Sequence, residues 1–164
     1  MAIRKIRAMD DPILRKQSKE VKDVTLRNRI LINDMLDTMY DAQGVGLAAV
    51  QVGVLKRIVV IDVGEGPIIM INPVIIETSG EQTGLEGCLS LSGKFAQVTR
   101  PNWVKARAFD EKMEEFEIEG EDFLARAICH ECDHLDGKVY IDIAESKIYD
   151  SEELEQLENE ENEE

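Results

Sequence analysis

The hydrophobic positions follow a helical period near both ends of the chain. From Thr25 to Ala42, apolar residues recur every three or four positions, which predicts an amphipathic helix capped by Asp23 or Thr25 and ended by Gly44. The residues predicted to face the core are Leu26, Ile30, Met35 or Leu36, and Met39 or Tyr40. Residues 121–135 return to the helical period, and a final helix is predicted over 151–158.

Strand-like patterns occupy the middle of the chain. The predicted strands are residues 57–63, 68–71, 73–78, 103–110 and 114–119. The first contains the β-branched run Ile58-Val59-Val60-Ile61, and the last two alternate polar and apolar residues around a turn at 110–113. Because strands in the middle lie between helices at the two ends, the order predicts an α+β fold.

The run His130-Glu131-Cys132-Asp133-His134 uses the only two histidines of the chain. On a helix, positions i and i+4 lie one turn apart on one face, so both imidazoles can reach one metal ion. Glu131 lies about 100° round the helix from His130 and flanks that face. Two ligands and a general base form the core of a metal-dependent hydrolase.

A catalytic metal usually takes three protein ligands, and the spacing of residues alone does not identify the third. The position six residues after His134 is Tyr140, and Glu145 is no obvious candidate. Cys129 and Cys132 point away from the histidine face of the helix, so we expect them to pack beside the core. Cys88 remains, either as the third ligand or as a buried structural cysteine.

The charge is uneven along the 164 residues. Residues 148–164 carry nine of the 34 acids and no base, whereas the rest has 25 acids and 19 bases. We therefore expect one catalytic domain over 1–147 and an acidic helical tail over 148–164, a solubilising end rather than an interaction segment. Without a basic face, DNA binding is disfavoured.

The composition also predicts a cytoplasmic protein. Three cysteines do not suggest a disulfide framework, which favours a reducing compartment. No apolar stretch approaches the roughly 20 residues that span a bilayer, and the charged N-terminus does not read as a signal peptide. We expect no membrane partner.

Three segments in order carry a family resemblance. They are Gly44-Val45-Gly46-Leu47-Ala48-Ala49-Val50-Gln51, Glu86-Gly87-Cys88-Leu89-Ser90 and His130-Glu131-Cys132-Asp133-His134-Leu135-Asp136-Gly137. They resemble the three signature motifs of the peptide deformylase family, whose bacterial-type members remove the formyl group from the N-terminal formylmethionine of new polypeptides and release formate. The resemblance implies antiparallel or mixed sheets enclosing the central motif helix, with an N-terminal and a short C-terminal helix.

The resemblance also implies roles for individual residues. Cys88, His130 and His134 would hold one divalent metal, with Fe²⁺ expected and Zn²⁺, Ni²⁺ or Co²⁺ able to substitute. Glu131 would be the general acid/base for a metal-held water that acts as the nucleophile. Gln51 and the backbone N–H of Leu89 would form the oxyanion hole. The partners would be N-formylmethionyl nascent peptides, with the ribosome as one place of encounter, although the acidic tail argues against docking on ribosomal RNA.

The substrate would lie along backbone groups near Val45 and Gly46. The methionine side chain needs an apolar slot, and its candidate walls are Val45, Phe123 and Ala127, with the stem of Arg126 at the rim; packing in the core is the alternative for these residues. Glu86 and Gly87 complete the predicted substrate-binding set. Glu86 and Asp133 either orient the metal ligands or form ordinary salt bridges, for example to Arg100. One departure is Cys129, where family members often have glutamine.

Three other functions remain open from the sequence. A metalloprotease uses the same histidine motif with a different third ligand. A non-catalytic metal-binding or interaction module would act through the acidic tail. A deformylase-like enzyme could act on another N-formyl compound. A comparison of formyl-Met peptides with internal peptides as substrates separates the metalloprotease. Glu131→Ala tests the binding module, because a catalytic role predicts retained metal and lost turnover.

Overall fold

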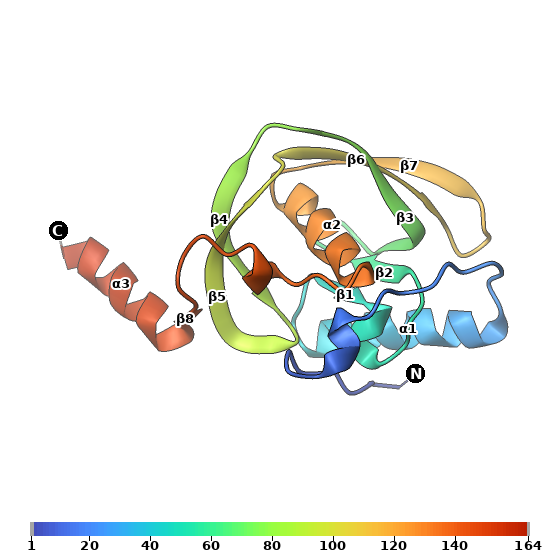
Figure 1. The fold of residues 1–164 in the computed structure, drawn as a ribbon, viewed down its shortest axis with the longest axis horizontal. Coiled ribbons are helices and arrows are strands. Elements are labelled where there is room, and N and C mark those ends of the chain that lie inside the picture. The colour runs from blue at the N-terminus through green and yellow to red at the C-terminus, as the bar shows by residue number, and fades with distance from the viewer. Residues whose placement is uncertain (1, 164) are drawn as a thin grey trace.

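The helix that carries both histidines lies among the strands of two antiparallel sheets (Figure 1). The computed structural model describes residues 2–163. Its helices are α1 (Leu26–Asp41), α2 (Asp122–Leu135) and α3 (Ser151–Glu163), with short 3-10 helices at Pro12–Arg15, Ala49–Val52 and Tyr140–Asp142. Its strands are β1 (Gly46–Ala48), β2 (Ile58–Ile61), β3 (Ile68–Ser79), β4 (Gln82–Cys88), β5 (Leu91–Arg100), β6 (Trp103–Phe109), β7 (Glu115–Glu121) and β8 (Tyr149–Asp150).

The larger sheet has the order β1-β2-β3-β6-β7, and the smaller one has the order β4-β5-β8. Each neighbouring pair is antiparallel. The predicted α+β class is therefore confirmed. β1 and β4 are end strands, so each has one edge without a strand partner in the described chain, and these two strands carry or flank the first two sequence motifs.

All strands predicted from the pattern lie in the larger sheet, whereas its end strand β1 and the strands of the smaller sheet were not predicted. The two runs predicted at 68–71 and 73–78 form one strand, β3, with a register shift where Asn72 adopts a φ of 52° before Pro73. The hairpin of β6 and β7 forms as predicted. β4 and β5 were not predicted from the pattern, because glycines interrupt their apolar residues and weaken the strand signal.

The helix α1 begins where Thr25 caps it, with the Thr25 hydroxyl accepting from Asn28 N at 3.2 Å. The predicted core face is wrong at two positions, because Leu26 and Ile30 are 74% and 49% exposed. Leu26 lies about 180° from Met35 on the helix, and Met35 faces the core. Tyr40 is also exposed. The buried apolar residues of this helix are Leu31, Ile32, Met35 and Met39.

The end of α1 also differs from the prediction. The left-handed residue after the helix is Gln43, with a φ of 57°, and not Gly44. Gly44 has another role, because a Cβ there would lie 2.5 Å from Leu89 Cδ1. The missing side chain lets the loop before β1 pack against the turn after β4.

The helix α2 packs its apolar face on the larger sheet. Ala125, Ile128 and Cys129 are buried with Val104 and Ala106 of β6, and Cys132 packs against the same cluster. The expectation that Cys129 and Cys132 pack on the core is confirmed. Burial fixes the rotation of α2 and turns its polar face, with the histidines, away from this cluster.

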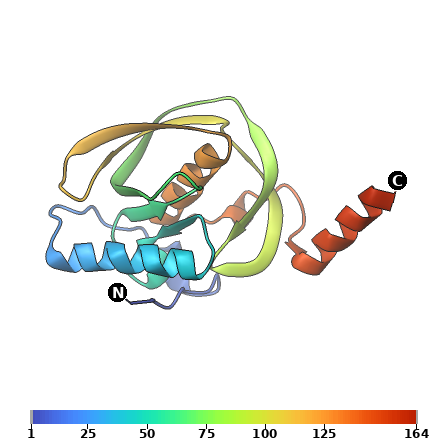
Figure 2. The same cartoon turned by 180° about the vertical axis from the view of Figure 1, so that it is seen from behind.

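The helix α3 projects away from the rest of the structure, as both views show (Figures 1 and 2). It extends to Glu163, five residues beyond the predicted end, and none of its residues is buried. The described part of the chain includes no helix that is both long and apolar enough to span a bilayer.

Candidate metal centre and active-site cleft

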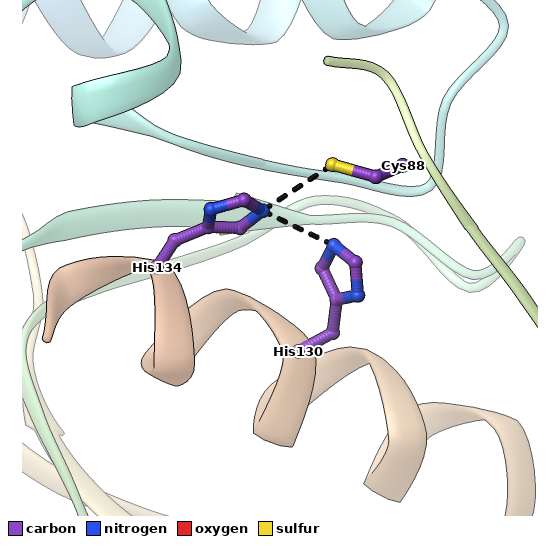
Figure 3. A group of neighbouring side chains, drawn as sticks. All are labelled: Cys88, His130 and His134. Carbon is purple, nitrogen blue, oxygen red and sulfur yellow. Dashed lines mark hydrogen bonds between the residues drawn. The ribbon is translucent and has the colours of Figure 1, made fainter. Parts of the chain in front are cut away.

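Cys88, His130 and His134 bring one donor atom each to a single point (Figure 3). His134 Nε2 lies 3.4 Å from Cys88 Sγ and 3.2 Å from His130 Nε2. All three donor atoms lie within 4.8 Å of one another. Among residues 2–163, this is the one group of three or more metal-binding side chains with this geometry.

The spacing of these donors fits a tetrahedral metal ion. Metal–nitrogen and metal–sulfur bonds of about 2.1 and 2.3 Å put neighbouring donors about 3.4–3.6 Å apart. Burial and the nearby His130 lower the pKa of His134, which keeps that imidazole in the neutral form that binds metals. Three ligands also leave a fourth position for water, as in catalytic sites.

The elements around the centre explain how distant residues meet. His130 and His134 stand one turn apart on α2, and Cys88 is the last residue of β4. A register irregularity between Glu86 and Cys88 interrupts the pairing of β4 with β5 just before the turn. Gly87 also needs its small size, because a Cβ there would lie 2.9 Å from the Phe95 ring.

Glu86 ties His130 to the smaller sheet. Its carboxylate accepts from His130 Nδ1 at 2.7 Å and from Arg100 at 2.7 and 3.1 Å. Arg126 donates to the same carboxylate at 2.9 Å, and Arg100 also pairs with Asp133 at 2.6 Å. Burial opposes ionisation of Glu86, but the hydrogen bonds from His130 and Arg100 outweigh it and lower the pKa to about 2. Glu86 thus has both roles predicted from the sequence: it contacts a predicted metal ligand, His130, and it forms a salt bridge with Arg100.

Glu131 is buried beside the donors. Its Oε1 lies 3.7 Å from His130 Nε2, and its Oε2 is buried without a hydrogen-bond partner among the described residues. Burial raises the pKa of this carboxyl to about 7. A Cβ on Gly46 would lie 2.9 Å from Oε1, so β1 runs directly against the carboxyl. A carboxyl with a pKa near neutral can both accept and return a proton.

Gln51 presents its amide nitrogen to the centre. Its Oε1 accepts from Ala48 N at 3.0 Å, which fixes the amide orientation, and its Nε2 lies 3.0 Å from Ser90 Oγ and 3.4 Å from Cys88 Sγ. The sequence pattern did not identify Ser90 as a functional neighbour. Leu89 lies in the turn directly after Cys88, between β4 and β5.

A cleft of 490 Å³ opens beside these residues. The predicted residues that line it are Val45, Gly46, Glu86, Gly87, Cys88, Leu89, Phe123, Arg126, Ala127, His130 and Glu131. It also includes residues of β5 and the turn before it that the sequence did not indicate, such as Leu91, Lys94 and Phe95. A larger hollow of 820 Å³ lies along the N-terminal segment and includes none of the predicted site residues.

The cleft residues on α2 differ in their exposure. Phe123 is 50% exposed and belongs to the open part of the cleft, whereas Ala127 is buried. Arg126 lines the cleft, but the prediction that its stem lies at the rim is wrong, because the side chain is mostly buried and its Nη1 donates to Glu86 and to the carbonyl of Val98. The nearby carboxylate gives the charged head a partner inside the protein.

The sequence model of a family described as polypeptide deformylase matches residues 3–148. The chain belongs to this family. A peptide deformylase of Agathobacter rectalis is 65% identical over 150 residues, which cover 92% of this chain and 95% of the relative. One of Lachnoclostridium phytofermentans is 61% identical and covers 92% and 94% of the two chains. This deformylase is therefore an enzyme, and the binding-module alternative loses its support.

Solved deformylase structures have the same fold. A crystal structure from Legionella pneumophila matches with a TM-score of 0.85 and 39% identity, over 99% of each chain. A structure from Ehrlichia chaffeensis in complex with actinonin matches with a TM-score of 0.85 and 39% identity, over 87% of this chain and 89% of that one. The three segments that carried the resemblance therefore lie within a matched whole fold.

Proposed function

We propose that this deformylase hydrolyses the formyl group from the N-terminal formylmethionine of nascent polypeptides and releases formate. The observation that carries the proposal is the convergence of Cys88, His130 and His134 beside the buried carboxyl of Glu131. The family membership and the cleft that leads to these residues support the same reaction.

Cys88, His130 and His134 would hold one divalent metal ion, with Fe²⁺ expected and Zn²⁺, Ni²⁺ or Co²⁺ as substitutes. When bound, such an ion makes water a nucleophile near neutral pH and polarises a carbonyl. The thiolate of Cys88 donates more charge than a third imidazole would and moderates this acidity. Glu86 would fix the ring of His130 and its tautomer by accepting from Nδ1, which leaves Nε2 free to bind.

Glu131 would act as the general acid/base. Burial raises the pKa of its carboxyl to about 7, so both the ionised and the protonated forms are present near neutral pH. The partnerless Oε2 can accept a proton from the attacking water. The same carboxylic acid then returns the proton to the leaving nitrogen, so that an amine departs instead of an amide anion.

Gln51 and Leu89 would stabilise the negative charge that develops on the formyl oxygen. The amide of Gln51 is held in place through Ala48 and Ser90 before any substrate arrives, so little reorganisation is needed. The N–H of Leu89 belongs to the turn beside Cys88 and would be the second donor. Two aimed donors favour the tetrahedral species over the flat ground-state amide.

The substrate main chain would lie between the two sheets. The end strand β1, with Val45 before it and Gly46 as its first residue, and the end strand β4, with Gly87, both border the cleft. An extended peptide can pair with free strand edges through its backbone, whatever its side chains are. The methionine side chain would enter beside Phe123, Arg126 and Ala127.

We further propose that residues 1–147 form the catalytic domain and that residues 148–164 form an acidic appendage. The enzyme would act in the cytoplasm, where formylated chains emerge from the ribosome. The acidic tail would not hold it on ribosomal RNA, since phosphates repel carboxylates.

The test is formate release from formyl-Met-Ala-Ser by protein purified without oxygen and analysed for metal. We expect one formate per peptide and a free methionine amine. An acetyl-Met peptide should be a poor substrate, because a methyl group must then fit where the formyl hydrogen lies. Cleavage of internal peptide bonds without formate would contradict the proposal and favour the metalloprotease.

A further inference from the structure

Arg126 places a guanidinium group inside the cleft. Its side chain is 7% exposed, and Nη1 donates to Glu86 Oε1 at 2.9 Å and to the Val98 carbonyl at 3.0 Å. An arginine side chain has five N–H donors, of which Nη1 carries two. The bonds to Glu86 and Val98 therefore both use Nη1. Nε and Nη2 have no hydrogen-bond partner among the described residues.

The remaining edge of Arg126 is not fully buried. The described chain has three buried side-chain nitrogen or oxygen atoms without a partner, namely Ser18 Oγ, Glu131 Oε2 and His134 Nδ1. Nε and Nη2 of Arg126 are not among these fully buried orphans, so each keeps some exposed surface within a mostly buried side chain, and Arg126 lines the cleft. Gly84 stands beside Nη2 and has no side chain to cover it; a Cβ there would lie 3.5 Å away.

We propose, on the basis of the function above, that Arg126 sets the side-chain specificity of the cleft and admits formylmethionine whose sulfur carries an oxygen. The substrate class is thus N-formylmethionine sulfoxide peptides in addition to N-formylmethionine peptides. A thioether sulfur is a weak acceptor, whereas oxidation makes the side chain polar. An apolar slot would leave that oxygen unsatisfied, which is costly.

The other side chains predicted to wall the methionine slot supply no donor. Phe123 and Ala127 are apolar, and the ionised Glu86 only accepts hydrogen bonds. Arg126 is held in place by that same carboxylate, so its free edge is already oriented when the substrate arrives. A fixed donor in a slot favours a side chain with an acceptor over an isostere without one.

The test compares formyl-Met-Ala-Ser with two analogues, in which methionine is replaced by methionine sulfoxide or by norleucine. For the unaltered enzyme, we expect kcat/KM for the sulfoxide peptide to lie within about tenfold of that for the norleucine peptide. In Arg126→Leu, the ratio of these two values should fall by about tenfold or more. The ratio within one variant is independent of metal content and of the fraction of active protein.

Matched variants keep the comparison decisive. Lys94→Met removes another cleft cation, and its ratio should equal that of the unaltered enzyme. Arg126→Lys keeps a cation beside Glu86 without the planar Nε–Nη2 edge, and it supplies the ratio where Arg126→Leu does not fold.

An unchanged ratio in both Arg126 variants, or a hundredfold preference of the unaltered enzyme for norleucine, overturns the inference. No formate from formyl-Met-Ala-Ser would instead refute the proposed function, and the inference with it.

Discussion

Glu86 accepts a hydrogen bond from His130 Nδ1 at 2.7 Å, on the side of the ring opposite the donor that faces Cys88 and His134. In Glu86→Gln, a neutral amide replaces the carboxylate, so the imidazole is held less firmly and is less basic. We expect metal affinity to fall about 10–100-fold. Competition with a coloured chelator measures this affinity, and Glu117→Gln on exposed β7 is the control. Equal affinity in both variants would show that Glu86 has only a structural role.

Glu131→Gln should separate chemistry from metal binding. The amide has the same shape as the carboxyl but cannot take up and return a proton, so kcat should fall by about 10²–10⁴. Metal content should remain near one ion per chain, because Glu131 is not in the ligand set. Single-turnover kinetics and metal analysis on the same sample give both quantities. A variant with normal turnover would exclude Glu131 as the acid/base.

Gln51→Met tests the oxyanion donor. The side chains have similar length, but methionine lacks the N–H that faces Cys88 Sγ, so kcat should fall about 10²–10³-fold. KM should change less, since the donor acts mainly on the transition state. Ser90→Ala removes a partner of the same amide and leaves the donor in place, and it should cost less. A larger loss in Ser90→Ala than in Gln51→Met would point to Ser90 as the more important group.

The pH dependence of stability should report on Asp34. Burial would raise its pKa, but hydrogen bonds from Arg4 and Ala2 lower it below the ordinary value. A carboxyl whose pKa is lowered by folding stabilises the fold at pH values above its unfolded-state pKa, which is near 3.9. That stabilisation is lost as the pH falls through the folded-state pKa. We therefore expect Asp34→Asn to destabilise by about 1 kcal/mol at pH 7 and 5.

Urea denaturation at pH 7, 5 and 3.5 checks this expectation. The difference in unfolding free energy between the variant and the unaltered protein should narrow at pH 3.5, because this pH lies below the unfolded pKa of Asp34 and the unfolded chain then takes up protons there. Asp37→Asn is a control on the same helix, where the described residues include no ion pair to Asp37. If the difference in unfolding free energy between Asp34→Asn and the unaltered protein grew as the pH fell, the prediction would be wrong.

Deletion of residues 151–164 tests the proposed division of the chain. None of the described residues of α3 is buried, and the helix projects away from the rest of the fold. We expect kcat/KM for formyl-Met-Ala-Ser to stay within about twofold and the melting temperature to change little. Solubility should decline, since seven described acids of α3 are lost. A tenfold loss of activity would make the tail part of the catalytic unit.

Local periodicity was sufficient to predict α2, because its apolar face and its histidine face repeat within one element. It placed Cys129 and Cys132 on the core for the same reason. In α1 the pattern misled, since Leu26 and Ile30 share the exposed face and only the contact with the sheet decides which face is buried. β4 and β5 were missed because Gly84, Gly87 and Gly93 interrupt their apolar residues and dilute the strand signal.

The candidate site was only partly accessible to sequence reasoning. Spacing gave the two histidines, whereas the position of Cys88 rested on resemblance, because 42 residues separate it from His130 and no local rule spans that distance. The network of Glu86, Arg100 and Arg126 joins β4, β5 and α2. Such pairings depend on the packing of three elements, so the sequence could list the charges but not their partners.

The origin of the three donors in two separate parts of the fold has a consequence for how the enzyme matures. An unfolded chain can offer a metal ion two nearby imidazoles, but the sulfur joins them only after β4 has packed against α2. Complete coordination thus belongs to the native state alone, and at a free metal concentration of 100 Kd such binding adds about 2.7 kcal/mol to the stability. Metal supply then governs the lifetime of the folded enzyme as well as its turnover.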